Sequence, residues 1–262
     1  MSAAELWALG EYERLAVTLR PAARELVLAA GISAGQWVLD VAVGTGNVAV
    51  EAVALRARVT ASDITPQLVE HGRSRARRDG LAIDWEVADV TALPQDDGAV
   101  DVVTSAFGAM FATPVPRVIA ELARVLRPGG VLAMANWVPE GPVAELFALL
   151  GRYGPRPPAD TPAPTEWGRE EVVRERLADA FAAVTIERRA LRSIYPDAAA
   201  LWHFHAENAP PVVALLRTLD ADRRHELVRR WIALADELLP RWHGEVLYAP
   251  EYALVVARRR SG

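Results

Sequence analysis

The residues best suited to do chemistry surround a glycine-broken turn in the first fifth of the chain. Gly44-Thr45-Gly46 follows the apolar run WVLDVAV and precedes a stretch rich in alanine and valine, in the pattern G-x-G-x-x-A. Glycines in such a turn let the backbone approach a ligand closely, and the N-terminus of a following helix offers unpaired N–H groups to negative charge. The turn therefore predicts a site for a dinucleotide or for another charged nucleoside cofactor.

Three carboxylates accompany the turn, each in or at the end of a predicted strand. Asp40 would repel a pyrophosphate but attract a cationic amino-acid group, which favours a cofactor with a positive end. Asp63 stands about twenty positions beyond the turn, where a carboxylate accepts hydrogen bonds from ribose hydroxyls. Asp89 is placed to accept a hydrogen bond from an adenine amine. Alternatively, Asp40 is a core carboxylate bound to backbone N–H groups, and the other two are helix caps or turn residues.

The elements that must position these residues predict an α/β fold. Short β-branched runs alternate with helical periodicity, which implies a parallel, doubly wound sheet. The predicted strands are WVLDVAV, RVTASD, IDWEVAD, AVDVVTSA, GVLAMANW, AVTIERRAL and VLYAPEYALVVARR. The clearest helix is PVPRVIAELARVL, which should end at Arg127-Pro128-Gly129-Gly130 because proline cannot continue it and glycine accepts the left-handed cap.

The flanks of this pattern are predicted to be helical. Residues 3–30 read as two helices, the second beginning at Pro21, and they form an expected N-terminal cap over residues 1–35. Residues 36–262 form the cofactor-binding domain, in which a proline-rich connection runs from Pro155 to Pro164. Two helical stretches over 194–243, inserted between the sixth and seventh strands, predict a lid above the sheet. The alternative is an oligomerisation surface, such as that of a homodimer.

Composition narrows the class of protein. The 262 residues are 52% hydrophobic and 24% charged, and no apolar run approaches the roughly 20 residues that a bilayer crossing needs. The net charge of −5 disfavours nucleic-acid binding. There is no cysteine, which excludes disulfides and thiolate metal ligands, and no other metal-ligand set is visible. The N-terminus lacks the pattern of a signal peptide, so a cytoplasmic location without membrane association is expected.

Several segments together resemble a known family. VLDVAVGTGN, ASDIT, VADVTALP, FGAMF and ELARVLRPGG are similar, in this order, to the motifs of class I S-adenosylmethionine (SAM)-dependent methyltransferases, in the broad group that includes quinone-biosynthesis enzymes. The resemblance is close over residues 5–137. It implies a Rossmann-like sheet of seven mostly parallel strands with an antiparallel last strand, SAM as cofactor and S-adenosylhomocysteine as product. Val43 stands where many relatives have cysteine.

The resemblance also implies which residues contact the cofactor. Asp40 would lie beside the methionine moiety, Asp63 would hold the ribose hydroxyls, and Ser105 would lie near the sulfonium. The adenine would pack on Ile64 and be read by Asp89 together with the backbone of the next residue. The full expected set is Tyr12, Asp40, Gly44, Thr45, Gly46, Asp63, Ile64, Asp89, Val90 and Ser105.

Methyl transfer from a sulfonium is an in-line displacement, so holding the two reactants in line supplies much of the rate without a catalytic side chain. If a base assists, the candidates are His203 and His205 in LWHFHAEN, beside Trp202 and Phe204; the alternative is that both only pack the lid helix. The expected acceptor is a mainly hydrophobic natural product or quinone-like molecule, methylated at oxygen, nitrogen or carbon. Two alternatives remain at this point: a protein of the same fold that binds the cofactor without methylating, as a recruited cyclase or ligand sensor, and an NAD(P)-dependent oxidoreductase.

Overall fold

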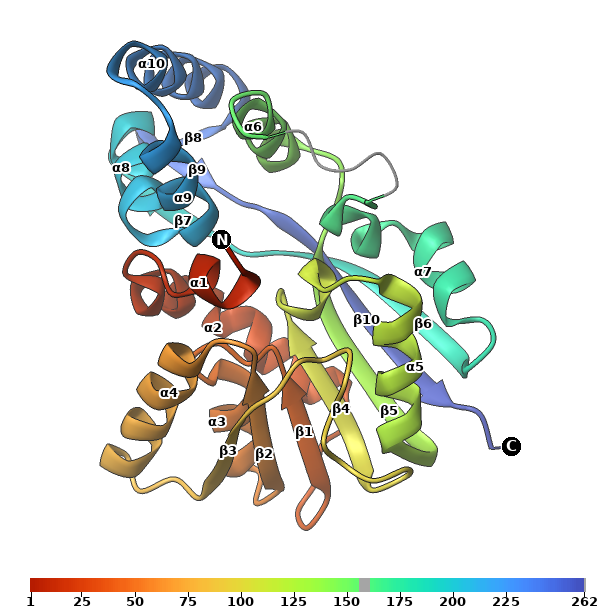
Figure 1. Cartoon of the computed structure of the whole chain (residues 1–262). Helices are drawn as coiled ribbons and strands as arrows, with labels where there is room; N and C mark the ends of the chain where they lie inside the picture. Colours follow the sequence, from red (N-terminus) through yellow and green to blue (C-terminus); the bar gives the residue numbers. More distant parts are fainter. Residues whose placement is uncertain (156–160, 262) are drawn as a thin grey trace.

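A seven-stranded sheet forms the centre of the molecule (Figure 1). The computed structural model describes residues 1–155 and 161–261. The strand order is β3-β2-β1-β4-β5-β10-β6, and β10 runs antiparallel to both of its neighbours while the pairs from β3 to β5 are parallel. The prediction of seven strands with an antiparallel last one is confirmed. The strands are β1 (Trp37–Val41), β2 (Arg58–Asp63), β3 (Ile83–Val87), β4 (Val100–Ala106), β5 (Leu126–Trp137), β6 (Phe181–Ala190) and β10 (Glu251–Arg259).

Helices cover both faces of this sheet. The helices α2 (Tyr12–Ala29) and α3 (Asn47–Ala54) bury their apolar side chains on one face. The helices α5 (Val115–Val125) and α7 (Glu170–Leu177) do so on the other. The helix α4 (Pro66–Arg78) lies along β2 and β3. Because the inner strands are covered on both sides, most of their side chains are buried, and apolar residues predominate in β1 and β5.

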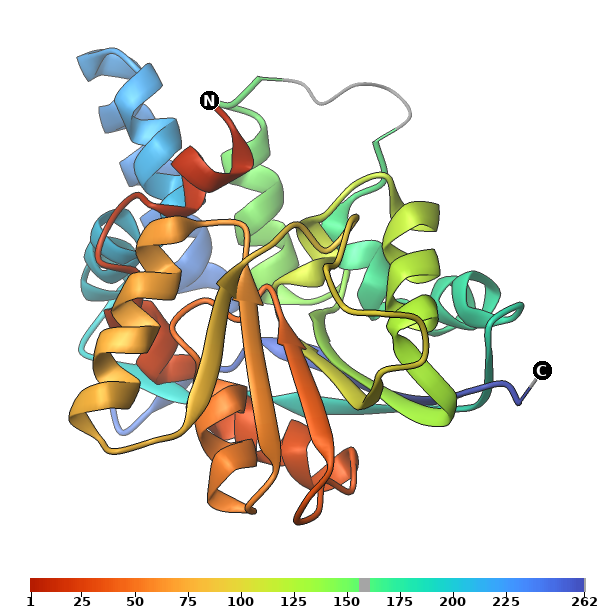
Figure 2. The same ribbon diagram turned by 60° about the horizontal axis from the view of Figure 1, so that its bottom comes forward.

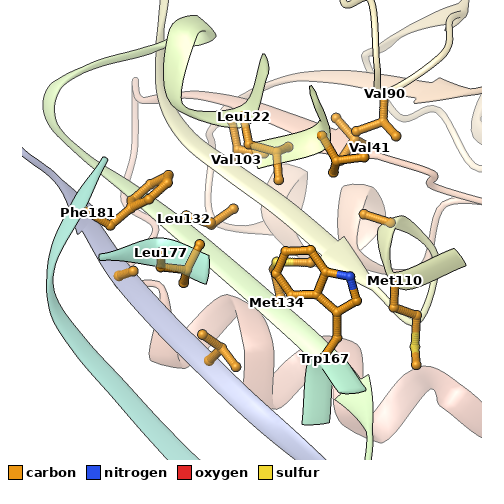
Figure 3. Packing of buried hydrophobic residues seen from close by; sticks show 14 of the residues in the cluster. Val41, Val90, Val103, Met110, Leu122, Leu132, Met134, Trp167, Leu177 and Phe181 are labelled. Carbon is orange, nitrogen blue, oxygen red and sulfur yellow. The ribbon is translucent and has the colours of Figure 1, made fainter. Parts of the chain in front are cut away.

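The larger core cluster lies between the sheet and α5, α7 and the short helix η2 (Pro164–Gly168) (Figure 3). Trp167 of η2 packs near Met134 of β5 and Met110 of the short helix η1 (Ala109–Phe111), while Leu177 and Phe181 fill the far end. These side chains are almost completely buried. Burial of a large apolar side chain contributes about 1.5–3 kcal/mol, so this cluster fixes the sheet on which the site is built.

A second body, here called the lid, is inserted between β6 and β10. Its elements are β7 (Ser193–Tyr195), α8 (Ala198–Asn208), α9 (Pro210–Thr218), α10 (Ala221–Leu238), β8 (Arg241–Trp242) and β9 (Glu245–Tyr248). Together with α6 (Pro142–Gly151), the lid buries a separate hydrophobic cluster that includes Leu201 and Leu227. In both overall views its helices lie beside α1 (Ala3–Trp7) and away from the C-terminus (Figure 1, Figure 2).

The lid differs from its prediction in one respect: it contains a small sheet. The run VLYAPEYALVVARR, predicted as one strand, is divided at Ala249-Pro250 into β9 and β10. The strand β9 pairs with β7 and β8 in the order β7-β9-β8, whereas β10 joins the main sheet. Pro250 has no N–H to donate to a ladder, which explains why pairing is interrupted there.

One helix boundary and one strand boundary, the start of β5, were also predicted wrongly. Pro21 lies inside α2 rather than at its start, because the buried stripe that includes Ala16, Ala23 and Leu26 continues past it and the proline ring faces solvent. At the other site, α5 ends at Val125 and β5 begins at once, so the Arg127-Pro128-Gly129-Gly130 segment forms a bulge in β5. Within the predicted proline-rich connection, residues 156–160 lie outside the described residues.

None of the helices in residues 1–155 and 161–261 has both the length and the hydropathy needed to cross a membrane.

Candidate active site

The glycine turn lies at the carboxyl end of β1. In the sheet β1 lies between β2 and β4, so the strand order reverses here, and open α/β sheets bind ligands at such a point. Gly44 and Gly46 have φ of 58° and 91°, so both use the left-handed region that glycine adopts without strain. Gly46 is the N-cap of α3. A Cβ on Gly44 would lie 2.9 Å from the Tyr12 hydroxyl oxygen, so Tyr12, the first residue of α2, rests directly on the turn.

Asp63 holds this turn in place from the end of β2. One carboxylate oxygen accepts a hydrogen bond from the Gly44 N–H at 2.9 Å, and the other accepts one from the Thr65 N–H at 2.9 Å. Burial raises the pKa of Asp63, and the donors of Gly44 and Thr65 oppose that rise. The carboxylate therefore has structural partners, yet it also lines the cavity described below. The structural and ligand-binding interpretations of Asp63 are compatible.

Asp40 is almost completely enclosed beneath the same turn. Its oxygens accept hydrogen bonds from the Ala49 N–H at 3.1 Å and from the Thr104 hydroxyl at 2.8 Å. Ala49 is the third residue of α3, so the Asp40 carboxylate caps the N-terminus of this helix. Gly46, the N-cap residue, has no side chain that could do so. Desolvation raises the pKa of Asp40 to about 7, against the hydrogen bonds from Thr104 and Ala49. These are the contacts expected of a core carboxylate, which was the alternative interpretation of Asp40. The position of Asp40 beside the methionine moiety of the cofactor stays a prediction.

On its other side the turn is supported by an indole ring. A Cβ on Gly46 would lie 2.6 Å from Cη2 of Trp85, and one on Gly72 of α4 would lie 2.1 Å from the same atom. Trp85 thus fills a gap between the turn and α4 that exists only because both positions lack side chains.

A cavity of about 180 Å³ opens above the carboxyl ends of β1, β2 and β3; we call it the strand-end cavity. Six of the ten predicted cofactor residues line it, namely Tyr12, Gly44, Asp63, Ile64, Asp89 and Val90. Asp89 at the end of β3 accepts hydrogen bonds from the Thr91 N–H and hydroxyl, both at 2.8 Å, while its side chain stays exposed. Two carboxylates and an apolar surface therefore share one opening.

A second cavity, of about 100 Å³, adjoins the first; we call it the aromatic cavity. Trp7, Tyr12, Phe107 and Phe111 line both cavities and form the boundary between them. Trp7 lies edge-on to Phe111 with ring centroids 5.1 Å apart. Beyond this boundary the walls come from α2, β5, α6 and the lid with its flanking residues, and no Asp, Glu, Lys or Arg is among the described residues that line the aromatic cavity. The surroundings of this cavity favour an uncharged, flat molecule.

The other predicted residues lie elsewhere. Asp40 and Thr45 line a cavity of about 20 Å³ that also touches Tyr12. Ser105 is buried; its hydroxyl donates to the Val41 carbonyl and accepts from the Ala109 N–H, both at 3.0 Å, so it ties β4 to β1 and η1 instead of facing either of the larger cavities. His203 is exposed on α8 and lines neither of the two larger cavities, and its role as a base stays a prediction. His205 is buried and lines the aromatic cavity.

Three residues that line the aromatic cavity, Trp7, Tyr195 and Tyr248, could not be identified from the sequence. Trp7 comes from α1, where one aromatic residue five positions before Tyr12 was the only available signal. The two tyrosines belong to the small lid sheet, which was not predicted. Their place in the cavity follows from the pairing of β7 with β9, and no local pattern encodes that pairing.

Comparisons with known proteins agree with this geometry. Residues 38–130 match the family model of the methyltransferase domain. An uncharacterised protein of Mycobacterium tuberculosis is 35% identical over 259 residues, which span 97% of this chain and 93% of that protein. The ubiquinone/menaquinone biosynthesis C-methyltransferase UbiE of Paracoccus denitrificans is 41% identical over 123 residues, which cover 45% of this chain and 49% of that enzyme, about half its length.

The fold has solved counterparts as well. The YcgJ protein of Bacillus subtilis superposes with a TM-score of 0.62 at 19% identity, over 92% of this chain and 100% of that chain. The glycine turn, the acidic strand ends and the seven-stranded sheet with its antiparallel strand thus occur together with the family match. The chain belongs to the class I SAM-dependent methyltransferases, and SAM is its cofactor.

Proposed function

We propose that this methyltransferase acts on a mainly hydrophobic small molecule, of natural-product or quinone-like character, bound in the aromatic cavity. The observation that carries the proposal is the apolar, uncharged wall of that cavity and its shared boundary with the strand-end cavity. An acceptor in the aromatic cavity would thus lie next to a cofactor in the strand-end cavity. The membership of the family removes the oxidoreductase alternative.

The residues of the strand-end cavity fit the adenosine part of SAM. Asp63 and Asp89 are carboxylates at adjacent strand ends and can accept hydrogen bonds from ribose hydroxyls and an adenine amine. Ile64 and Val90 offer apolar surface to a flat purine. When bound, SAM supplies a methyl group carried on a positively charged sulfur. The sulfur is the leaving group and becomes part of a neutral thioether.

The chain's own contribution is to orient the acceptor and exclude water. Trp7, Tyr12, Phe107 and Phe111 surround the passage between the cavities, and Phe107 stacks on Trp137 with ring centroids 3.9 Å apart. Rigid aromatic walls hold an acceptor with little freedom, and orientation of this kind supplies several kcal/mol of the barrier reduction.

Two measurements test the proposal in sequence. Calorimetry with S-adenosylhomocysteine, NAD and NADP establishes that only the first binds, and that Asp63→Ala removes the binding. The protein is then incubated with SAM and matched hydrophobic and polar acceptors, and products are weighed by mass spectrometry. A gain of one methyl group on hydrophobic acceptors supports the proposal; methylation confined to charged or strongly polar acceptors overturns it.

A variant connects this activity to the aromatic cavity. Phe111 is 37% exposed and lines both cavities, so Phe111→Ala should lower kcat/KM for hydrophobic acceptors by about tenfold at small cost to folding. Val87→Ala is the matched control, because Val87 is also an exposed hydrophobic residue but lies on β3 outside the described cavity walls. Equal effects of the two substitutions would place the acceptor elsewhere.

A further inference from the structure

The aromatic cavity has one polar corner, and the lid forms it. Tyr195 of β7, His205 of α8 and Tyr248 of β9 all line the cavity. The His205 and Tyr248 rings lie edge to face with centroids 5.3 Å apart, and the two tyrosine rings lie 6.3 Å apart. Three side chains able to form hydrogen bonds therefore meet where the remaining walls are almost entirely apolar.

The protonation of His205 follows from its hydrogen bond. Nδ1 lies 2.9 Å from the carbonyl oxygen of Leu201, one helical turn earlier in α8. Because a carbonyl oxygen can only accept, Nδ1 carries the hydrogen. Burial lowers the pKa of His205, with the Leu201 bond opposing it, so the ring is neutral near pH 7. Nε2 then has no hydrogen and can only accept a hydrogen bond.

Within the described residues, Nε2 of His205 and the hydroxyls of Tyr195 and Tyr248 have no hydrogen-bond partner, whereas Nδ1 does. Nε2 is not among the fully enclosed side-chain atoms that lack a partner, so a ligand in the cavity can reach it. Burial also raises the pKa of both tyrosines, to about 12 for Tyr195, so they stay neutral. The corner is therefore uncharged, and its imidazole is available to a ligand with a hydrogen to donate.

We propose that His205 recognises a hydroxyl group on the methyl acceptor, and that the acceptor is a neutral phenol or similarly hydroxylated aromatic compound whose O–H donates to Nε2. The proposal rests on the proposed function, since it assumes that the acceptor occupies the aromatic cavity. The aromatic walls would pack against the ring of such a molecule, and His205 would accept a hydrogen bond from its hydroxyl. A methyl ether of the same ring would leave Nε2 unpaired and bind more weakly.

The test compares a phenol with its own methyl ether. Binding of para-propylphenol and para-propylanisole to the protein saturated with S-adenosylhomocysteine is measured by calorimetry. The wild type should bind the phenol about tenfold more tightly, the equivalent of one hydrogen bond. In His205→Phe the two probes should bind equally, with the affinity for S-adenosylhomocysteine unchanged. Equal affinities in the wild type, or the same ratio in the variant, would overturn the proposal.

Nitrogen NMR of the wild-type protein labelled at histidine gives a test that does not depend on the folding of the variant. His205 should show a neutral ring protonated at Nδ1, and its Nε2 resonance should shift with para-propylphenol but not with para-propylanisole. A ring protonated at Nε2, or equal shifts with both probes, would overturn the proposal. A wrong assignment of the proposed function would be seen in a different experiment. In that case no hydrophobic acceptor would gain a methyl group in the mass-spectrometric screen.

Discussion

Asp40 illustrates how one buried carboxyl group couples the stability of this fold to pH. Its pKa rises from an ordinary 3.8 to about 7, chiefly because burial disfavours the ionised form. The folded protein therefore keeps the Asp40 proton at pH values where the unfolded chain has lost it. The resulting contribution to stability is complete below about pH 3.8 and is lost as the pH rises through about 7, with a slope of about 1.4 kcal/mol per pH unit.

Asp40→Asn should remove this dependence. An asparagine can keep both contacts without a charge, if its amide oxygen accepts from the Ala49 N–H and its amide NH2 donates to the Thr104 hydroxyl oxygen. We expect the free energies of unfolding of the two proteins to be similar at pH 5, and the variant to be more stable by about 3 kcal/mol at pH 8, because the wild type loses about 1.4 kcal/mol per unit between pH 5 and about 7. Urea denaturation at both values measures this, and all other titrating groups cancel in the comparison. A difference that does not change with pH would contradict the raised pKa.

Asp89 offers a binding test with little structural cost. Its carboxylate lines the strand-end cavity but is exposed, and its contacts are to Thr91 alone. Asp89→Ala should weaken binding of S-adenosylhomocysteine by five- to tenfold, one hydrogen bond, and lower stability by no more than about 1 kcal/mol. Asp84→Ala, on the exposed side of the same strand, is the control and should leave calorimetric affinity unchanged.

At the scale of elements, the position of Tyr12 depends on how α1 and α2 dock against the lid. Gly10, between the two helices, has φ of 69°, and the Glu11 N–H donates to the Glu207 carbonyl of α8. A Cβ on Gly10 would lie 2.8 Å from that same carbonyl oxygen, so only glycine fits this approach. The N-terminal helices are thereby fixed to the lid as well as to the sheet.

Gly10→Ala should therefore lower the free energy of unfolding by more than backbone strain alone would. Gly35 is a matched control because it also has a positive φ, 82°, yet a Cβ there would meet nothing within 4 Å. Gly35→Ala should lower stability by about 1 kcal/mol, and Gly10→Ala by clearly more, with a loss of affinity for S-adenosylhomocysteine only in the latter. Urea unfolding and calorimetry distinguish the two. Equal losses would show that the contact with Glu207 does not position Tyr12.

Elements with strong periodicity could be predicted from the sequence, and those set by distant contacts could not. The strands β1 to β4 were found close to their predicted bounds, and helices separate consecutive strands from β1 to β5 except between β3 and β4. The division of the last strand at Pro250 and the continuation of α2 through Pro21 depend on which surfaces are available for burial. For the site, motif order indicated the residues around the strand-end cavity, whereas the aromatic cavity is assembled from α1, α2, β5, α6 and the lid, which are distant in the sequence.

At the scale of the whole molecule, the strand-end cavity lies between the sheet and the N-terminal helices, whereas the aromatic cavity extends to the lid, so their ligands should protect different segments. S-adenosylhomocysteine should slow amide hydrogen exchange in the glycine turn and the first turn of α2, because Gly44 and Tyr12 border its cavity. Adding para-propylphenol should then slow exchange in α8 and β9, which carry His205 and Tyr248. Mass spectrometry of peptic peptides reads both steps. Protection of α8 and β9 by the cofactor product alone would contradict this division.

The indole of Trp85 limits how the family can vary. It occupies the space left by the missing side chains of Gly46 and Gly72, which belong to different helices. Any side chain at position 72 would require a much smaller residue at position 85, and a small residue at 85 would leave a void under the turn unless 72 or 46 grew. These positions should therefore change together in the evolution of the family. In an alignment of full-length relatives, a tryptophan at position 85 should accompany glycine at both other positions, and its loss should coincide with the appearance of alanine or a larger residue at 72.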